Sequence, residues 1–198
     1  MRLLGSRPSP FTSKVRMAAA ICGIDLELVP TDTAEEGSTL IGSNPIGKIP
    51  ALILDDGSTL YDSRVICEWL DRSSGNLLIP QGLAEWSHAK RIEALADGMA
   101  EAAMMTLYEV RYRPEEKRHQ PWVDKQWRRA HRSLDALGRE VETLGDMPNL
   151  AHIAVASDLG WLDLRYSSVF RDRHAALAQW MDDFYATHPH LAARRPAA

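Results

Sequence analysis

A short stretch around residue 50 constrains the fold more than any other part of this chain of 198 residues. Residues 44–50 read Asn-Pro-Ile-Gly-Lys-Ile-Pro, and an apolar run at 51–54 follows directly. The turn at 55–58, Asp-Asp-Gly-Ser, separates that run from a second short strand at 59–61. Two strands joined by Asp-Gly predict a β-hairpin. The proline at its mouth fixes where the first of these strands begins.

The backbone before Pro50 is the first of two candidate ligand-binding features. Proline has no N–H with which to join a strand ladder, so the backbone of its neighbour is left unpaired or exposed. If the Ile49–Pro50 peptide bond is cis, the chain turns sharply and presents the N–H and C=O of Ile49 outward. These groups can pair with an extended peptide, as an added strand would.

The second feature is Asp62-Ser63, which begins a helix directly after the hairpin. At a helix N-terminus a serine hydroxyl and bare backbone N–H groups face outward and attract a carboxylate. Together the two features predict a peptide-like ligand that carries a carboxylate. The alternative is a purely structural role, because Asp and Ser are common helix-start residues.

The first 75 residues alternate short strands with helices, which indicates an α/β domain with the element order βαβ–(α)–ββα. Its first strand, helix and second strand have the lengths of a right-handed parallel crossover. The elements outside the hairpin are expected as strands at 3–5 and 26–29, helices at 10–22 and from 62 to about 71, and a loop or irregular helix at 31–43. The apolar side of the last of these helices comprises Val65, Ile66, Trp69 and Leu70.

Helical periodicity dominates the rest of the chain and indicates a small all-α bundle. We expect domains at 1–75 and 86–198, joined by a turn-rich linker at 76–85. Asn149 is expected to cap a further helix, whereas His152 cannot accept as a carboxylate would, so the paired capping box is expected to be lost. The apolar stripes comprise Ile92, Leu95, Met99, Ala103, Leu107 and Val110, then Val123, Trp127, Ala130, Leu134, Leu137, Val141 and Leu144.

Composition argues against several function classes. The net charge is -4 and no long basic run occurs, which argues against a nucleic-acid partner. No apolar stretch is long enough to cross a membrane, and the first residues lack the apolar core of a signal peptide. Cys22 and Cys67 show neither a CxxC motif nor metal-ligand spacing, so we expect no metal, buried inert thiols and a reduced cytoplasmic protein.

The ordered set of Pro50 before the third strand, Asp62-Ser63 on the next helix and an all-helical domain behind resembles the cytosolic glutathione S-transferases. The resemblance covers nearly the whole chain, and it is strongest to small bacterial members and to the serine-type theta and zeta classes. Residues 9–16 are similar to the family segment after strand one, and 91–98 to the first helix of its second domain. The resemblance implies a thioredoxin-like N-terminal domain, an all-α C-terminal bundle and a homodimer.

The same resemblance implies a glutathione site built from five residues around the hairpin. Pro50 would be a cis-proline, and Ile49 would pair its backbone with the cysteinyl part of glutathione. Ser63 and Asp62 would hold the γ-glutamyl end. Lys48 matches a basic position in this groove, although a loop lysine is more often solvated. Residues 31–43 contain no Lys, Arg or His, where several family members hold the glycine end with a basic residue.

Ser9 falls where serine-type members keep the hydroxyl that steadies the glutathione thiolate. The residues alone favour another role, because Ser before Pro10 is a common helix-cap pattern. The resemblance favours catalysis, and both roles compete for one hydroxyl. Residues 9–12 occupy the place of the CxxC of thioredoxins and glutaredoxins, and the absence of both sulfurs there excludes dithiol exchange.

The electrophile pocket is expected between Phe11, which also borders glutathione, and the first helix of the second domain. Met104, Tyr108 and Tyr112 are its candidate wall residues, while Met99 and Leu107 are expected in the core. Arg111 and Arg113 would suit an acidic substrate, or simply form a charged helix end.

The sequence therefore predicts a detoxification enzyme, a glutathione transferase that adds glutathione as cosubstrate to a small hydrophobic electrophile by conjugation, substitution or isomerisation. The alternative is a non-catalytic ligand-binding or protein-interaction module of the same fold. The missing basic residue in 31–43 and the short Asp62 favour that alternative mildly. No identity of the electrophile follows, because such a pocket is built from variable side chains on a shared scaffold.

Overall fold

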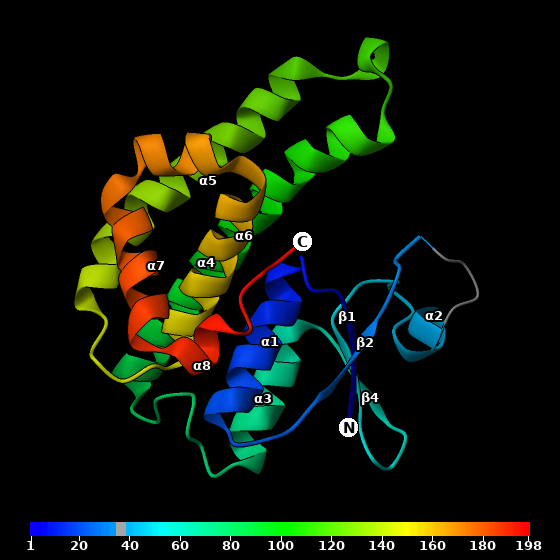
Figure 1. Cartoon of the computed structure of the whole chain (residues 1–198), viewed down its shortest axis with the longest axis vertical. Coiled ribbons are helices and arrows are strands. Elements are labelled where there is room, and N and C mark those ends of the chain that lie inside the picture. Colours follow the sequence, from blue (N-terminus) through cyan, green and yellow to red (C-terminus); the bar gives the residue numbers. More distant parts are fainter. Residues whose placement is uncertain (35–38) are drawn as a thin grey trace.

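The computed structural model of the protein describes residues 1–34 and 39–198 (Figure 1). Its N-terminal part is built on a four-stranded sheet in the order β2-β1-β3-β4. β1 is parallel to β2 and antiparallel to β3, and β3 is antiparallel to β4. The strands are β1 (Arg2–Gly5), β2 (Glu27–Pro30), β3 (Ala51–Ile53) and β4 (Thr59–Leu60).

Helices cover both faces of this small sheet. The helices α1 (Pro10–Ile21) and α3 (Ser63–Ser73) lie between the sheet and the helical part, and α2 (Thr39–Ser43) lies on the other side (Figure 1). Alternation along the strands explains this, because successive side chains point to opposite faces. Leu3 and Leu52 join the large core with α1 and α3, while Leu4 and Ala51 pack with Leu40 of α2. The predicted βαβ–α–ββα order is confirmed.

The C-terminal part is all-helical, as predicted. Its centre is α6, in which every residue from Leu150 to Leu162 is buried. The large hydrophobic core is continuous from the sheet into the bundle, because α1 packs directly against α6. The elements are α4 (Leu83–Tyr112), η1 (Glu115–Lys117), α5 (Gln120–Glu140), η2 (Val141–Thr143), α6 (Leu150–Arg173), α7 (Ala175–Thr187) and α8 (Pro189–Ala192).

Element boundaries differ from the expectations by small amounts. α4 begins at Leu83, inside the range 76–85 expected as the linker, and the domain limits stay a prediction. The region expected as a loop or irregular helix contains α2 at its end, and its residues 35–38 lie outside the described residues. Among the helices of the described residues, none is both long and apolar enough to span a membrane.

Two residues assigned to apolar stripes are exposed instead. Val65 of α3 is 48% exposed and Val110 of α4 is 57% exposed, so both predictions are wrong. Val110 lies where the end of α4 projects beyond the bundle together with the start of α5 (Figure 1). Periodicity records which face of a helix is apolar, but not how far a neighbour covers that face.

The expected loss of the capping box at α6 is also wrong. Asn149 accepts from the N–H of Ala151 at 2.9 Å, and Nδ1 of His152 accepts from the N–H of Asn149 at 3.3 Å. The other ring nitrogen of His152 lies 2.8 Å from the carbonyl oxygen of Gly145. A neutral imidazole that donates through Nε2 leaves Nδ1 bare, so it can serve as the acceptor that Glu or Gln usually supplies.

Two features hold the loop between β1 and α1 in place: a close approach of the backbone at Gly5 to α1, and contacts with the C-terminal tail. A Cβ on Gly5 would lie 2.6 Å from Cγ2 of Thr12, so β1 reaches α1 this closely only with glycine there. The hydroxyl of Ser13 donates to the carbonyl of Arg194 at 2.7 Å, and the N–H of Ala197 donates to the carbonyl of Arg7 at 3.1 Å. The tail therefore ends beside the start of α1 (Figure 1).

Candidate functional site

The sheet topology gathers three predicted site segments at one edge. The start of β3 lies beside the end of β1, because these strands are antiparallel neighbours. The end of β4 lies beside the start of β3 for the same reason. Ser9 follows β1, the Ile49–Pro50 bond precedes β3, and Asp62-Ser63 follow β4. All three therefore leave the sheet at the same end.

Ser9 is the N-cap of α1. Its Oγ accepts from the N–H of Thr12 at 3.2 Å, and Pro10 occupies the first helical position. The N–H of Ser9 donates to the carbonyl of Ser6 at 3.1 Å, which fixes the loop in front of the helix. The cap bond uses a lone pair of the hydroxyl and leaves its hydrogen free. Capping and donation to a ligand therefore do not compete, contrary to the expectation from sequence.

The Ile49–Pro50 peptide bond is cis, as the family resemblance implies. Within residues 1–34 and 39–198, no hydrogen bond engages the N–H or C=O of Ile49. Asn44 holds the loop in front of it: the side-chain amide donates to the carbonyl of Lys48 at 2.7 Å, and Oδ1 accepts from Ile46 at 3.0 Å. Sequence reasoning gave no role to Asn44, although a buried Asn before Pro45 is a turn signal.

Asp62 and Ser63 begin α3. Oδ1 of Asp62 accepts from the N–H of Arg64 at 3.0 Å, so Asp62 is the N-cap, and the residue is exposed. Ser63 is 4% exposed and is the first residue of α3, so its N–H has no partner within the helix. Nε of Arg64 donates to Oδ2 of Asp97 at 2.8 Å, which ties this first turn to α4.

The predicted electrophile-pocket residues lie on α1 and on the second half of α4. Phe11, Met104 and Tyr108 are half-buried, whereas Tyr112 is 62% exposed. The rings of Tyr108 and Tyr112 lie 5.5 Å apart, and burial raises the pKa of Tyr108. Met99, expected in the core, is fully buried. Lys48 is exposed at the site edge.

The two arginines considered for an acidic substrate are already engaged. Arg113 forms an ion pair with Glu109 at 3.3 Å. The guanidinium of Arg111 lies 5.5 Å from the ring centroid of Tyr112. These contacts favour the interpretation of a charged helix end.

A buried ionic cluster behind the site was not predicted. Nζ of Lys14 lies 2.7 and 2.8 Å from the two oxygens of Asp97 and 3.1 Å from Oε1 of Glu93, and all three residues are buried. Lys90 adds a short hydrogen bond to Oε2 of Glu93. One sequence signal existed, because Lys14 is four residues from Ala18 and so shares the buried face of α1.

The electrostatics keep this cluster charged. Burial acts to lower the pKa of Lys14, but Asp97 and Glu93 outweigh it, so that pKa is raised. Cys67 beside the cluster is buried, and burial raises the pKa of its thiol. Cys22 is buried too, so both thiols are protonated small hydrophobes. In the described parts of the chain, no group of His, Cys, Asp or Glu is arranged to hold a metal ion.

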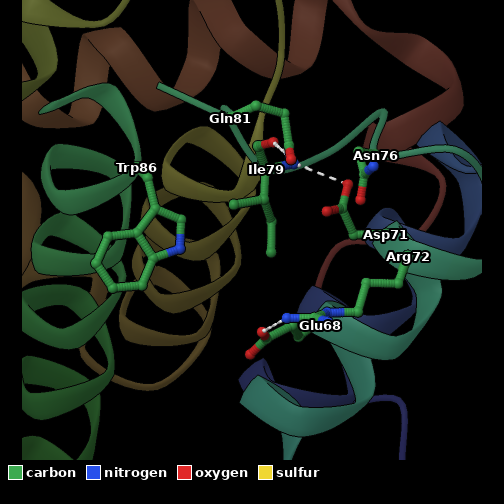
Figure 2. Close-up of a pocket in the computed structure, with 7 residues that line it drawn as sticks. All are labelled: Glu68, Asp71, Arg72, Asn76, Ile79, Gln81 and Trp86. Atoms are coloured by element: carbon green, nitrogen blue, oxygen red, sulfur yellow. Dashed lines mark hydrogen bonds and ion pairs between the residues drawn. The ribbon is translucent and has the colours of Figure 1, made fainter. Parts of the chain in front are cut away.

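A hollow of about 290 Å³ lies away from these residues, between the end of α3 and the start of α4. Figure 2 shows Trp86 of α4 on one side and Glu68 and Arg72 of α3 on the other. Asp71 also lines the hollow, and its Oδ1 accepts from the N–H groups of Leu78 and Ile79 at 2.6 and 2.9 Å. The hollow contains none of the predicted site residues.

Comparison with known proteins agrees with this architecture. The N-terminal-domain model of the glutathione S-transferases matches residues 8–73, and the C-terminal-domain model matches residues 120–183. An uncharacterised GST-like protein of Escherichia coli K12, YibF, is 32% identical over 169 residues, which is 83% of each chain. The chain belongs to the glutathione S-transferase family. Both halves of this family member match, so the assignment covers the sheet and the bundle alike.

Solved bacterial members of the family superpose closely on this one. A Methylobacillus flagellatus glutathione S-transferase with glutathione bound has a TM-score of 0.91 at 36% identity over 99% of both chains. A Pseudomonas fluorescens Pf-5 glutathione transferase family member with bound glutathione has a TM-score of 0.90 at 34% identity, over 100% of this chain and 99% of that one. A second structure of the Pseudomonas protein holds S-(propanoic acid)-glutathione.

Proposed function

We propose that this family member is a glutathione transferase in which Ser9 stabilises the glutathione thiolate for attack on a small hydrophobic electrophile. One observation carries the proposal: the helix cap Ser9, the backbone of Ile49 and the start of α3 all emerge at one edge of the sheet. Each of them has a donor or acceptor without a partner in the described chain: the hydroxyl hydrogen of Ser9, the backbone of Ile49 and the N–H of Ser63. The glutathione-bound relatives support glutathione as the ligand that fills these groups.

Activation of sulfur needs only a donor aimed at it, because the thiolate is the nucleophile. The hydroxyl of Ser9 accepts from Thr12 and has its hydrogen left to donate to the thiolate. The N-terminus of α1 adds a partial positive charge at the same point. Both effects favour ionisation and lower the pKa of bound glutathione, whose thiol proton leaves to solvent.

The remaining contacts would hold the peptide. The N–H and C=O of Ile49 pair with the cysteinyl unit as an added strand does. The hydroxyl and N–H of Ser63 donate to the γ-glutamyl carboxylate as charge-assisted bonds, and Asp62 accepts from its ammonium. Lys48 is the cation proposed for the glycine carboxylate, since the segment 31–43 carries none in its sequence.

The electrophile would lie between Phe11 and the second half of α4, against Met104, Tyr108 and Tyr112. The sulfur electron pair forms a C–S bond with the electrophilic carbon. In substitution the leaving group departs with the bonding pair; in addition the neighbouring carbon takes a proton from water. In isomerisation glutathione adds and is then released. A tyrosine hydroxyl can donate to the oxygen on which charge develops.

Isothermal titration with glutathione tests the binding step. Wild-type protein should bind, and Ser63→Ala should bind about tenfold to a hundredfold more weakly, because a hydrogen bond to a charged group contributes roughly 1.5–3 kcal/mol. Ser58→Ala is the matched control, since Ser58 lies in the exposed turn between β3 and β4. Absence of heat from the wild type at millimolar glutathione would contradict the proposal.

A non-catalytic carrier or interaction module is the second candidate. It is favoured by the lack of a basic residue in the described part of 31–43 and by the short side chain of Asp62. A panel of electrophiles assayed with glutathione separates the two. Turnover of any of them supports the enzyme, whereas binding of glutathione without turnover across the panel supports the carrier.

We further propose a cytoplasmic homodimer that uses the exposed face of α3 and α4. Val65 and Trp86 are 48% and 44% exposed, and the hollow of Figure 2 lies on this side of both helices. Leu70, on the apolar side predicted for this helix, is fully buried in the protein's own core and cannot contribute to the contact. Trp69 packs partly against that core.

A further inference from the structure

The buried ionic cluster contains one group that the proposed function leaves unexplained. Asp158 of α6 is fully buried, and neither of its carboxyl oxygens receives a hydrogen bond from a donor in the described residues. An isolated buried carboxylate is costly, so a native protein pairs it or neutralises it. Asp158 faces titratable groups on three other helices: Lys14 of α1, Glu93 and Asp97 of α4, and Tyr185 of α7.

Among the described residues, the carboxyl group of Asp97 is the side chain with which Asp158 can share a hydrogen bond. Asp97 is an acceptor already, because it takes two hydrogen bonds from Lys14 and one from Arg64. Two carboxyl groups form a hydrogen bond only when one of them holds a proton. Asp97 has two cations as partners and Asp158 has none, so the proton belongs on Asp158.

A charge count within the cluster supports this assignment. The fully buried ammonium of Lys14 faces the carboxylates of Glu93 and Asp97. Ionised Asp158 would place a third carboxylate beside them, in a medium where like charges repel strongly. The other cations, Arg64 and Lys90, sit at the partly exposed rim of the cluster. Burial and the charge of Asp97 accordingly raise the pKa of Asp158 well above its ordinary value.

We propose that Asp158 carries a proton in the folded protein and donates it in a hydrogen bond to Asp97, which makes Asp158 a positioning residue for the first turn of α3. Asp97 is held from three sides, by Lys14, Arg64 and Asp158. Its bond to Nε of Arg64 fixes the residue next to Ser63. This last step, from Arg64 to ligand binding, rests on the proposed function.

Infrared difference spectroscopy at neutral pH tests the proton directly. Wild type minus Asp158→Asn should show the carbonyl band of a protonated carboxyl group. Asp163→Asn is the matched control on the same helix, because Arg171 lowers the pKa of Asp163 and holds it ionised. Its difference spectrum should lack that band. Absence of the band from the wild-type difference would overturn the proposal.

The pH dependence of unfolding is a second readout. The pKa of Asp158 is raised in the folded state, so its stabilising effect is complete below the unfolded pKa of about 3.9 and is lost as pH rises toward the folded pKa. Relative to Asp158→Asn, the folding equilibrium constant of wild type should fall about tenfold per pH unit in that window. For Asp163, whose folded pKa is lowered, the sign is opposite and the change lies below the unfolded pKa of about 3.9. Parallel wild-type and Asp158→Asn profiles would contradict the proposal.

Glutathione titration tests the positioning step. An asparagine amide can still donate to Asp97, so Asp158→Asn should keep wild-type affinity, whereas Asp158→Leu removes the donor and should weaken binding about tenfold. Equal affinities of the Asn and Leu variants would overturn the positioning role. If the wild type itself binds no glutathione, the proposed function fails, but the infrared band and the pH profile still decide where the proton lies.

Discussion

The hydroxyl of Ser9 combines two roles because each uses a different part of the group. A serine hydroxyl has one hydrogen to donate and two lone pairs to accept with. The cap bond from Thr12 occupies a lone pair at 3.2 Å, and the hydrogen remains for a ligand. Loss of this side chain should therefore affect both stability and chemistry.

We expect Ser9→Ala to lower kcat by about a hundredfold to a thousandfold, as removal of one preorganised donor does elsewhere. Stability should fall by about 1 kcal/mol through the lost cap. The pH profile of turnover should shift upward, since the bound thiol loses a donor that favours its charged form. Rate against pH and urea unfolding measure these effects.

Asn149→Ala is the control for Ser9→Ala. It removes the cap of α6 and should cost a similar free energy of unfolding, with the rate profile unchanged. A Ser9→Ala enzyme whose rate-versus-pH profile matches wild type would remove Ser9 from the proposed chemistry.

Lys14 contrasts with Ser9, because its charged group is buried and paired with carboxylates inside the protein. Lys14→Met should lower the free energy of unfolding by about 3–5 kcal/mol, since it leaves Asp97 and Glu93 without their buried cation. Lys90→Met is the control, because Lys90 is partly exposed and its loss should cost roughly 1 kcal/mol or less. Equal losses in urea unfolding would show that the cluster does not depend on Lys14.

The roles of residues that act on their immediate neighbours in the chain could be predicted from sequence. Pro50 and Asp62 act through their own backbone, so their neighbours in the chain reveal them. Lys14 could not be predicted in this way, because its partners lie 79 and 83 residues away. Ser9 is intermediate: its cap was readable from Pro10, but its free hydrogen became visible only with the bond to Thr12.

At the scale of elements, the start of α6 illustrates a capping box built with histidine. Burial lowers the pKa of His152, so the imidazole stays neutral and keeps Nδ1 as an acceptor. Sequence reasoning looked for a carboxylate at this position and overlooked the neutral ring. The tautomer follows from the hydrogen bond between Nε2 and the carbonyl of Gly145.

We expect His152→Gln to keep the helix start and to change its pH dependence. The folded pKa of His152 lies below its unfolded value of about 6.5, so its contribution is present above that pH and is lost as pH falls toward the folded pKa. Glutamine supplies the usual acceptor without titrating. Between pH 7 and pH 5 the midpoint temperature of thermal unfolding should fall more for wild type than for the variant. Parallel plots of this temperature against pH would contradict the role of His152.

The sequence predicted the presence of the helices better than it predicted which of their apolar residues are buried. The stripe on α5 is buried at Ala130, Leu134 and Leu137, because α4 packs against that face and α7 contacts it as well. The same periodic signal failed at Val110, where the end of α4 extends past its neighbours. A sequence pattern shows which face of a helix is apolar. Whether that face is buried depends on how far the neighbouring helices extend along it.

At the scale of the whole molecule, the face of α3 and α4 should decide assembly. Val65→Arg should convert the proposed dimer to a monomer, because a charge would be buried at the contact without a partner. Val110→Arg is the matched control, since it places the same charge on an equally exposed valine at the far end of α4. Sedimentation velocity measures both, and a wild-type monomer would contradict the dimer.

The C-terminal tail contacts α1 through Arg194 and the loop before Ser9 through Ala197. A probe attached to the tail can therefore report on the site. A fluorescent dye coupled at residue 198 would stand beside that loop while every ligand-binding group stays native (Figure 1). Its emission should report occupancy of the site by ligands that give no absorbance change. A bulky fusion at the same end would instead pull on the loop, so immobilisation is better made through the exposed turn at 55–58.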